Sequence, residues 1–412
     1  RALIELVERS EEGLDDKLRA KGLKIFRKII EREAPVSKPA AEWETDDWFE
    51  LRGKIIRKQN ELTSFGLVEM ICKLFPSTNS RKIIKECILL SISLLIGGNL
   101  QAQEAFLEFM KEDHQNDFMQ SVEKLISGEI ENLKKDMVRA NQRYAKKNLF
   151  GEDVNTDNNN NQEKNAAAKL MNTERALATE IADSEAQANK ESQDTIDILV
   201  KLFRLLQLLC EGHNLSLQNH LRMQTVSNGT RNPRSHDFIS SSAAWFGSYI
   251  RFANVDSLPF GDQLLDFLIE AVQGPCTDNQ KTLVTSKIIN FCMDYATIFN
   301  KNSELKRRDF ITREKLDDFQ KSITKAMKLL YSLLEGNVDE SIIEEMSHQI
   351  DFNFLMLKLT KDFETFCENL SKSLKITEHL KIPTIIEHLK NKPESFDDTI
   401  LESFGVFILL LT

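Results

Sequence analysis

Two glutamates stand where a carboxylate is electrostatically unfavourable. Glu211 precedes Gly212 at the end of a predicted helix, and Glu270 lies in the last turn of a predicted helix that ends before Gly274. The C-terminal end of a helix carries unpaired carbonyl groups and a partial negative charge, so a carboxylate there is destabilising by up to about 1 kcal/mol. A bound cation would reverse this effect, and carboxylate and carbonyl oxygens are the ligands that calcium prefers. The pair is therefore a candidate cation site, and the alternative is a solvated carboxylate at each helix end.

The other reactive side chains form weaker candidates. Glu335 shares the helix-end position without further support. Cys210 and His213 could face each other as nucleophile and base, but no acidic partner or oxyanion feature accompanies them. His379 and His388 are too far apart in sequence to lie on neighbouring helical turns, which does not favour a metal site. The sequence has no P-loop, GxGxxG or HExxH motif, and we predict that the chain is not an enzyme.

The composition narrows the class of protein. A chain of 412 residues can form two or three domains, and its net charge of -10 argues against a nucleic-acid partner. The 15 glycines and 8 prolines are few, as is typical of helical proteins. The six cysteines are scattered in or beside apolar segments with no CxxC pair, which predicts buried thiols in a reducing compartment.

The chain carries no predicted signal peptide or membrane span. Its most apolar stretch, Phe404–Leu411, is far shorter than the ~20 residues that cross a bilayer. The sequence begins with Arg rather than Met and ends inside this stretch. We therefore expect a fragment of a longer protein.

Apolar residues recur with helical spacing over much of the chain. Three such runs cover Glu61–Phe75, which Pro76 should end, Ile84–Leu95 and Leu199–Leu209. One helix ending also recurs, an apolar run followed by Gly and then Asn, at residues 97–99, 212–214 and 336–337. Both residue types tolerate the left-handed conformation that ends helices. This recurrence predicts an all-α fold of stacked helical hairpins, an armadillo-like superhelix.

The composition also divides the chain into segments. Residues 151–195 are polar and rich in Asn, with few large apolar side chains, so we expect a mobile insertion there. It separates an N-terminal helical block at 1–150 from a helical domain at 196–300 and a C-terminal helical segment at 301–412. A shorter polar stretch, residues 227–235, is predicted to be a loop.

Several motifs resemble one family. Residues 202–224, LFRLLQLLCEGHNLSLQNHLRMQ, resemble a signature of the RIH-associated domain of ryanodine receptors and inositol trisphosphate receptors. Residues 269–283, IEAVQGPCTDNQKTL, are similar to the second signature, and residues 331–338, YSLLEGNV, to the next helix in ryanodine receptors. Residues 56–103 match the preceding helical block in the same order. The resemblance is collinear over roughly residues 50–360 and leaves open which of the two branches is nearer.

The resemblance implies the cytosolic, regulatory part of a calcium-release channel of the endoplasmic reticulum. In this family, an activating Ca²⁺ site takes carboxylates from the Glu after LLC and the Glu four residues before GPC, which are Glu211 and Glu270 here. A further ligand comes from a domain beyond the pore. The family's Thr-Glu-Tyr context reads Ile269-Glu270-Ala271 in this chain, and the loop between the signatures is rearranged. We expect Ca²⁺ binding that is weak in this chain alone.

The resemblance also implies partners. They would be the other domains and subunits of a membrane-embedded parent channel, expected to be a homotetramer. A second interpretation stays open, in which the chain is a soluble armadillo-like scaffold that binds a partner protein through its helical surface and has no channel activity.

Overall fold

A computed structural model describes residues 2–8, 16–33, 46–150, 187, 190–301, 313–336, 340–353 and 355–356. Within these residues every regular element is a helix, apart from one isolated bridge between Thr225 and Arg231, of which only Arg231 lies in the predicted polar loop at 227–235. The predicted all-α fold is confirmed. Most of the predicted insertion at 151–195 lies outside the described residues, although residues 190–195 are helical. Cys367, His379 and His388 also lie outside them.

The described helices include four consecutive units of three helices each. The first unit is α3 (Asp46–Ser64), α4 (Leu67–Ser77) and α5 (Arg81–Leu95). The second is α6 (Leu100–Glu112), α7 (Asp117–Phe150) and the helix over 190–210. The third is α9 (Leu215–Arg222), α10 (Phe238–Tyr249) and α11 (Leu258–Val272), with the 3₁₀ turn η2 (Val255–Ser257), and the fourth is α12 (Thr277–Thr285), α13 (Ile288–Lys301) and α15 (Arg313–Ser332). Helices α1 (Ala2–Glu8) and α2 (Asp16–Glu33) precede the units, and α16 (Glu340–Gln349) follows them.

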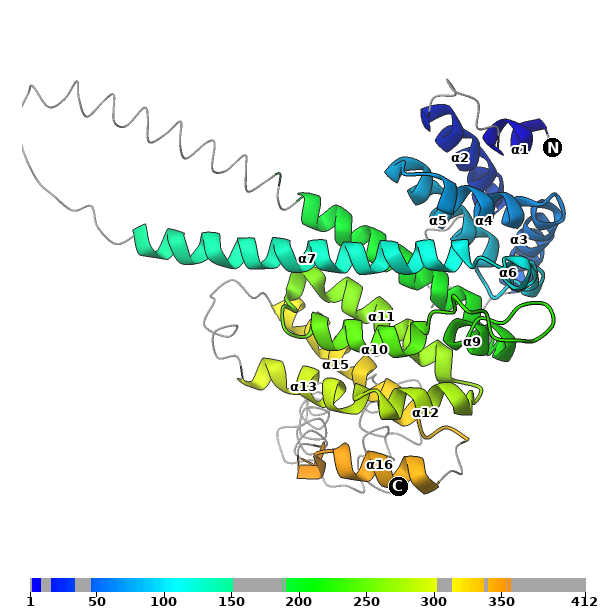
Figure 1. The fold of residues 1–412 in the computed structure, drawn as a ribbon. Helices are drawn as coiled ribbons and strands as arrows, with labels where there is room; N and C mark the ends of the chain where they lie inside the picture. The colour runs from blue at the N-terminus through cyan, green and yellow to red at the C-terminus, as the bar shows by residue number, and fades with distance from the viewer. Residues whose placement is uncertain are drawn as a thin grey trace, which may run out of the picture.

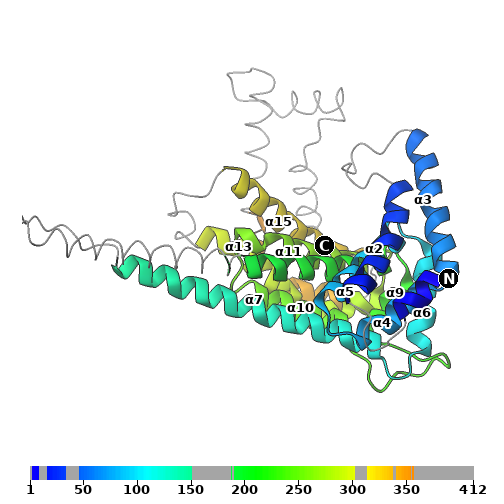
Figure 2. The same cartoon turned by 90° about the horizontal axis from the view of Figure 1, so that it is seen from above.

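Equivalent helices of neighbouring units contact one another. The first helices form a row in the order α3, α6, α9, α12, which α16 continues, while α4 contacts α7, α10 contacts α13 and α11 contacts α15. In Figure 1 this row of units runs from α3 at the upper right down to α12 and α16. The C-terminal end of α7 projects beyond the other labelled helices in both views (Figures 1 and 2). The predicted armadillo-like stack is thus confirmed, with three helices in each unit rather than a two-helix hairpin.

The first predicted helix is divided in the structure. α3 ends at Ser64 and α4 begins at Leu67, because Gly66 adopts a φ of 88° that terminates a helix. The expectation that Pro76 ends the run was wrong, since α4 continues to Ser77. The helix ends one residue later, in keeping with the hydrogen bond to the carbonyl four residues back that proline cannot donate.

Aromatic side chains join the second unit to the third. Phe203, on the helix over 190–210, is fully buried. Its ring centroid lies 6.0 Å from that of Trp245 on α10, and 5.8 and 6.0 Å from those of Phe260 and Phe267 on α11. Edge-to-face and tilted pairs at these separations stabilise the packing beyond area burial alone. This cluster fixes the position of α11 against the helix that carries Glu211.

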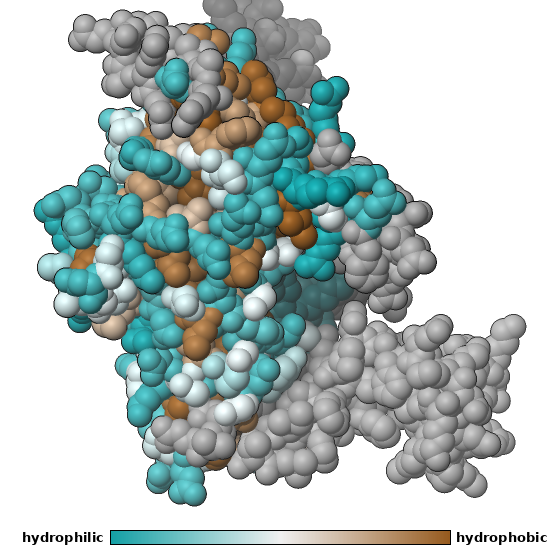
Figure 3. Space-filling model, turned by 90° about the vertical axis from the view of Figure 1, so that its right-hand side faces the viewer, coloured by the Kyte–Doolittle hydropathy of each residue, from teal (hydrophilic) through white to brown (hydrophobic). Residues whose placement is uncertain are grey.

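The surface shows no continuous apolar face in the view of Figure 3. That face is mostly hydrophilic, and its apolar side chains lie in small groups, mainly in the upper half. Exposed apolar residues such as Leu18 and Ile25 on α2 are 45% and 50% exposed. Among the described helices, none combines the length and hydropathy that a bilayer-crossing segment needs.

Replacing Phe203 with Ala should lower the free energy of unfolding by about 3–5 kcal/mol, because it removes a fully buried ring with three aromatic neighbours. Urea unfolding of the chain followed by circular dichroism measures the change. Phe65→Ala is the control, since Phe65 is 52% exposed and its loss should change stability by about 0.5 kcal/mol or less. Equal effects of the two substitutions would contradict this description of the core.

Candidate cation site

Each unit carries a buried glutamine that caps the end of its own third helix. The side-chain amide Nε2 donates to two backbone carbonyl oxygens: Gln59 to Ser93 (2.9 Å) and Ile96 (3.1 Å), Gln103 to Leu208 (3.0 Å) and Glu211 (2.8 Å), Gln218 to Glu270 (2.7 Å) and Gln273 (2.9 Å), and Gln280 to Ser332 (3.1 Å) and Glu335 (2.9 Å). The last carbonyls of a helix have no partner within the helix, so each amide supplies the missing donors. The residue after the second acceptor is glycine with a positive φ in all four units.

These caps align the four units residue by residue. Glu211 is the second acceptor of its unit, equivalent to Ile96, Gln273 and Glu335. Glu270 is the first acceptor of the next unit, equivalent to Ser93, Leu208 and Ser332. Among the four described units, carboxylates occupy both neighbouring positions only where the second unit meets the third. The sequence interpretation expected free carbonyls here, and this was wrong for Glu211 and Glu270, because Gln103 and Gln218 take their carbonyl oxygens.

The turns that follow the capped helices pack against one another in a row. A Cβ atom on Gly98 would lie 3.6 Å from Cγ of Glu211, so the first turn touches the second. A Cβ atom on Gly274 would lie only 2.5 Å from Cβ of His213, which leaves room for nothing larger than glycine. This close stacking brings the end of α11 beside the end of the helix over 190–210.

The two carboxylates lie near each other at this junction, close enough for the charge of Glu270 to raise the pKa of Glu211. Oε1 of Glu270 accepts a hydrogen bond of 3.1 Å from the backbone N–H of Gly212, directly after Glu211. Nδ1 of His213 lies 4.0 Å from the same oxygen. Oε2 of Glu211 is buried and has no hydrogen-bond partner, and the guanidinium of Arg204 lies 3.9 Å from it, beyond hydrogen-bond distance. An orphaned, buried carboxylate oxygen is costly unless a cation compensates it.

Burial raises the pKa of Glu211. The nearby Arg204 and Arg52 lower it, while the negative charge of Glu270 raises it further. The ionised form of Glu211 is therefore unfavourable as the site stands. Within the described residues, no three His, Cys, Asp or Glu side chains come together to hold a metal ion, so Glu211 and Glu270 form a partial ligand set.

Cys210 and His213 do not form a nucleophilic pair. Cys210 is fully buried, and burial together with the charge of Glu270 raises its thiol pKa well above the usual range. A thiol held neutral in this way is a poor nucleophile. The five described cysteines are all free and buried, as predicted (Cys72, Cys87, Cys210, Cys276 and Cys292). Glu335 is exposed, and the described residues place no second carboxylate beside it.

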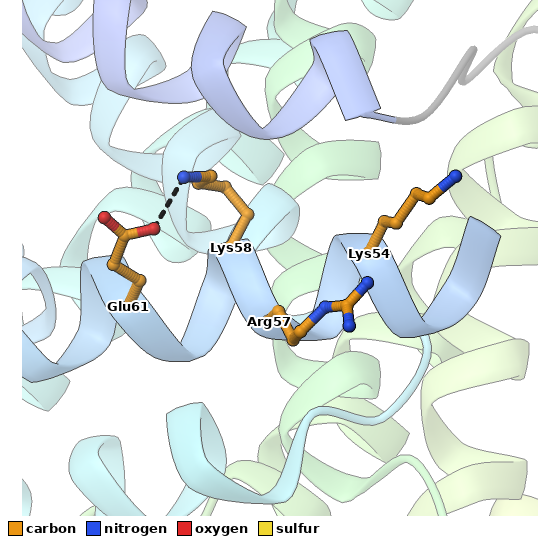
Figure 4. Close-up of a pocket in the computed structure, with 4 residues that line it drawn as sticks. All are labelled: Lys54, Arg57, Lys58 and Glu61. Carbon is orange, nitrogen blue, oxygen red and sulfur yellow. Dashed lines mark hydrogen bonds and ion pairs between the residues drawn. The ribbon is translucent and has the colours of Figure 1, made fainter. Parts of the chain in front are cut away.

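A shallow pocket of about 220 Å³ lies on α3, lined by Lys54, Arg57, Lys58 and Glu61. Figure 4 shows Lys54 and Lys58 pointing to the same side of the helix, with Glu61 beside Lys58. Lys58 pairs with Glu61 at 2.5 Å, and Lys54 with Glu50 at 2.8 Å. These surface ion pairs neutralise the charges of Lys54 and Lys58 within α3 itself.

The sequence interpretation missed the four capping glutamines. For Gln103, Gln218 and Gln280 the signal is a glutamine four residues after the residue that precedes a helix, as in Asn99-Leu-Gln-Ala-Gln103 and Asn214-Leu-Ser-Leu-Gln218. Asn99 and Asn214 are the N-caps of α6 and α9. The same spacing recurs from Cys276 to Gln280.

Replacing Glu211 with Gln should stabilise the chain at neutral pH in a chelating buffer. Because the pKa of Glu211 is raised, the folded chain binds this proton more tightly than the unfolded chain. The free energy of unfolding therefore decreases as the pH rises from the ordinary glutamate pKa of ~4.3 through the raised value. Glu211→Gln removes this ionisation, so its advantage should be absent below about pH 4 and present near pH 7.

Urea unfolding at several pH values measures this difference. Glu335→Gln is the matched control, because Glu335 holds the equivalent position but is exposed. A loss of stability near neutral pH in Glu211→Gln, with no pH-dependent difference from the control, would contradict the electrostatic account.

Comparisons with known proteins cover this junction. Residues 193–296, which include Glu211 and Glu270, match the family model described as RyR and IP3R homology associated. The chain is also similar to the inositol 1,4,5-trisphosphate receptor itr-1 of Caenorhabditis elegans, with 25% identity over 262 residues. The matched region is 55% of this chain and 9% of that receptor, so the chain corresponds to a small part of the relative. The predicted resemblance to the ryanodine receptor and inositol trisphosphate receptor family is confirmed.

Proposed function

We propose that this chain is a calcium-sensing, gating-coupled cytosolic region of an intracellular calcium-release channel of the endoplasmic reticulum. The observation that carries the proposal is the junction between the second and third units. There Glu211 and Glu270 occupy neighbouring positions at two helix ends, and Oε2 of Glu211 is buried without a hydrogen-bond partner. A divalent cation would compensate both carboxylates and the negative ends of both helices.

The geometry fits a calcium site that is completed by another domain. Calcium takes six to eight oxygen ligands, and two carboxylates supply at most four. The carbonyls of Glu211 and Glu270 are already occupied by glutamine amides, so the remaining ligands would come from water or from a docked partner. We therefore expect weak binding in this chain alone and tighter binding in the assembled parent, expected to be a homotetramer.

Neighbouring groups in this chain would hold the two carboxylates in place before calcium binds. The N–H of Gly212 holds one oxygen of Glu270 at 3.1 Å, which orients that carboxylate toward the end of the neighbouring helix. Arg204 partly offsets the charge of Glu211 from 3.9 Å. When bound, calcium would favour the domain arrangement in which its ligand shell is complete, and so shift the population toward the arrangement coupled to the gate.

Calcium titration of channel activity in the full-length parent protein tests the proposal. Glu211→Gln and Glu270→Gln should each move half-activation to calcium concentrations at least roughly tenfold higher, equivalent to about 1.4 kcal/mol of lost binding energy. Glu335→Gln should leave activation unchanged, because Glu335 is exposed and lies outside the junction of Glu211 and Glu270.

Unchanged activation in both Glu211→Gln and Glu270→Gln would overturn the proposed site. A full-length parent without channel activity would favour the alternative function, an armadillo-like scaffold that binds a partner protein.

A further inference from the structure

Two of the four glutamine caps hold the backbones of the proposed calcium ligands. Nε2 of Gln103 lies 2.8 Å from the carbonyl oxygen of Glu211, and Nε2 of Gln218 lies 2.7 Å from that of Glu270. Both glutamines are buried, each 1% exposed. Each amide also donates to a second carbonyl, three residues from that of the glutamate. It therefore stabilises the whole last turn of the helix.

The caps are linked to one another along the row of units. Oε1 of Gln59 accepts from Nδ2 of Asn99 at 2.9 Å, and Oε1 of Gln103 accepts from Nδ2 of Asn214 at 3.0 Å. These bonds fix which face of each amide points toward the carbonyls. Each asparagine also caps the first helix of the following unit, one turn before the next glutamine.

The backbone amides complete this linkage. The N–H of Gln103 donates to the carbonyl of Asn99, and the N–H of Gln218 donates to the carbonyl of Asn214. A continuous series of hydrogen bonds therefore runs from Gln59 through Gln103 to Gln218. Its part from Gln103 through Asn214 to Gln218 sets the position of the helix end that carries Glu211 relative to the end that carries Glu270.

We propose that Gln103 and Gln218 are positioning residues that hold Glu211 and Glu270 at the separation needed to bind one cation. This inference rests on the proposed calcium-sensing function. Without its cap, the last turn of each helix would lose two hydrogen bonds and gain freedom to unwind. The two carboxylates would then have to be ordered when calcium binds, which weakens binding even though no ligand is removed.

The chain provides its own control for this proposal. Gln59 and Gln280 make the same pair of bonds at helix ends where the described residues bring no two carboxylates together. All four glutamines are buried to the same degree. Removing any of them should affect stability alike, whereas only Gln103 and Gln218 should affect calcium affinity.

The experiment compares Gln→Met variants at the four positions in the full-length protein. Methionine keeps the length of the side chain and removes its amide. Calcium affinity is measured from the rise in Tm with calcium concentration, and stability from the Tm in chelator. We expect Gln103→Met and Gln218→Met to weaken calcium binding by roughly tenfold or more, the usual effect of removing a residue that orients a metal ligand. Gln59→Met and Gln280→Met should lower Tm in chelator by a similar amount, with affinity within about twofold of the parent.

A milder pair of variants serves if a methionine variant does not fold. Asn214→Ser keeps an oxygen that can accept from the N–H of Leu217 but loses the N–H that orients Gln103. Asn99→Ser makes the same change at Gln59. Only Asn214→Ser should weaken calcium binding. It should also speed hydrogen exchange at Gly212, whose N–H bonds Glu270.

Two outcomes would overturn the inference. If Gln103→Met, Gln218→Met and Asn214→Ser all bind calcium as the parent does, while Glu211→Gln and Glu270→Gln bind it weakly, the glutamines have no positioning role although the site stands. If the parent gains no calcium-dependent stability that Glu211→Gln and Glu270→Gln abolish, the proposed function fails, and the positioning role fails with it.

Discussion

The unpaired carbonyl groups at the ends of buried helices are the constraint on which the rest of this structure depends. A helix that ends at the surface can leave these groups to water, but here each third helix ends against the next unit, where an unpaired carbonyl is costly. One buried glutamine per unit solves this by donating to two carbonyls three residues apart. Because that glutamine lies on the first helix of the unit, each cap also ties the beginning of a unit to its end.

The same constraint creates the candidate site. The caps give the helix ends of successive units the same local structure. The close stacking of the turns at Gly98, His213 and Gly274 then brings neighbouring helix ends together. At the other two described junctions, the equivalent positions hold Ile96 with Leu208 and Gln273 with Ser332. Only Glu211 and Glu270 meet as a pair, and their burial leaves one carboxylate oxygen without a partner. The site thus forms because glutamates occupy two equivalent positions of the stacked units, and it is not built from a separate loop or pocket.

The sequence predicted part of this arrangement. Helical spacing located α5 and the helix over 190–210, the Gly-Asn endings located three of the four capped ends, and the helix-end electrostatics selected Glu211 and Glu270. The three-helix unit was not predicted, because the second unit contains the long α7 and a polar insertion that hide the repeat spacing. The caps were not predicted either, because a glutamine and its acceptor are 108 residues apart for Gln103 and Glu211. Gln59 also lacks the preceding asparagine that marks Gln103 and Gln218. A local spacing can mark Gln103, Gln218 and Gln280, but the distant carbonyls that they bond depend on tertiary contacts.

The most direct test of the account is a pair of cryo-electron microscopy maps of the full-length protein, one with calcium and one with a chelator. The account predicts density for one ion between the carboxylates of Glu211 and Glu270 in the calcium map, at ligand distances of about 2.3–2.6 Å. The amides of Gln103 and Gln218 should still hold the two helix ends, and further oxygen ligands should come from water or another domain. Ordered carboxylates with no ion between them at saturating calcium, or calcium density only elsewhere in the protein, would contradict it.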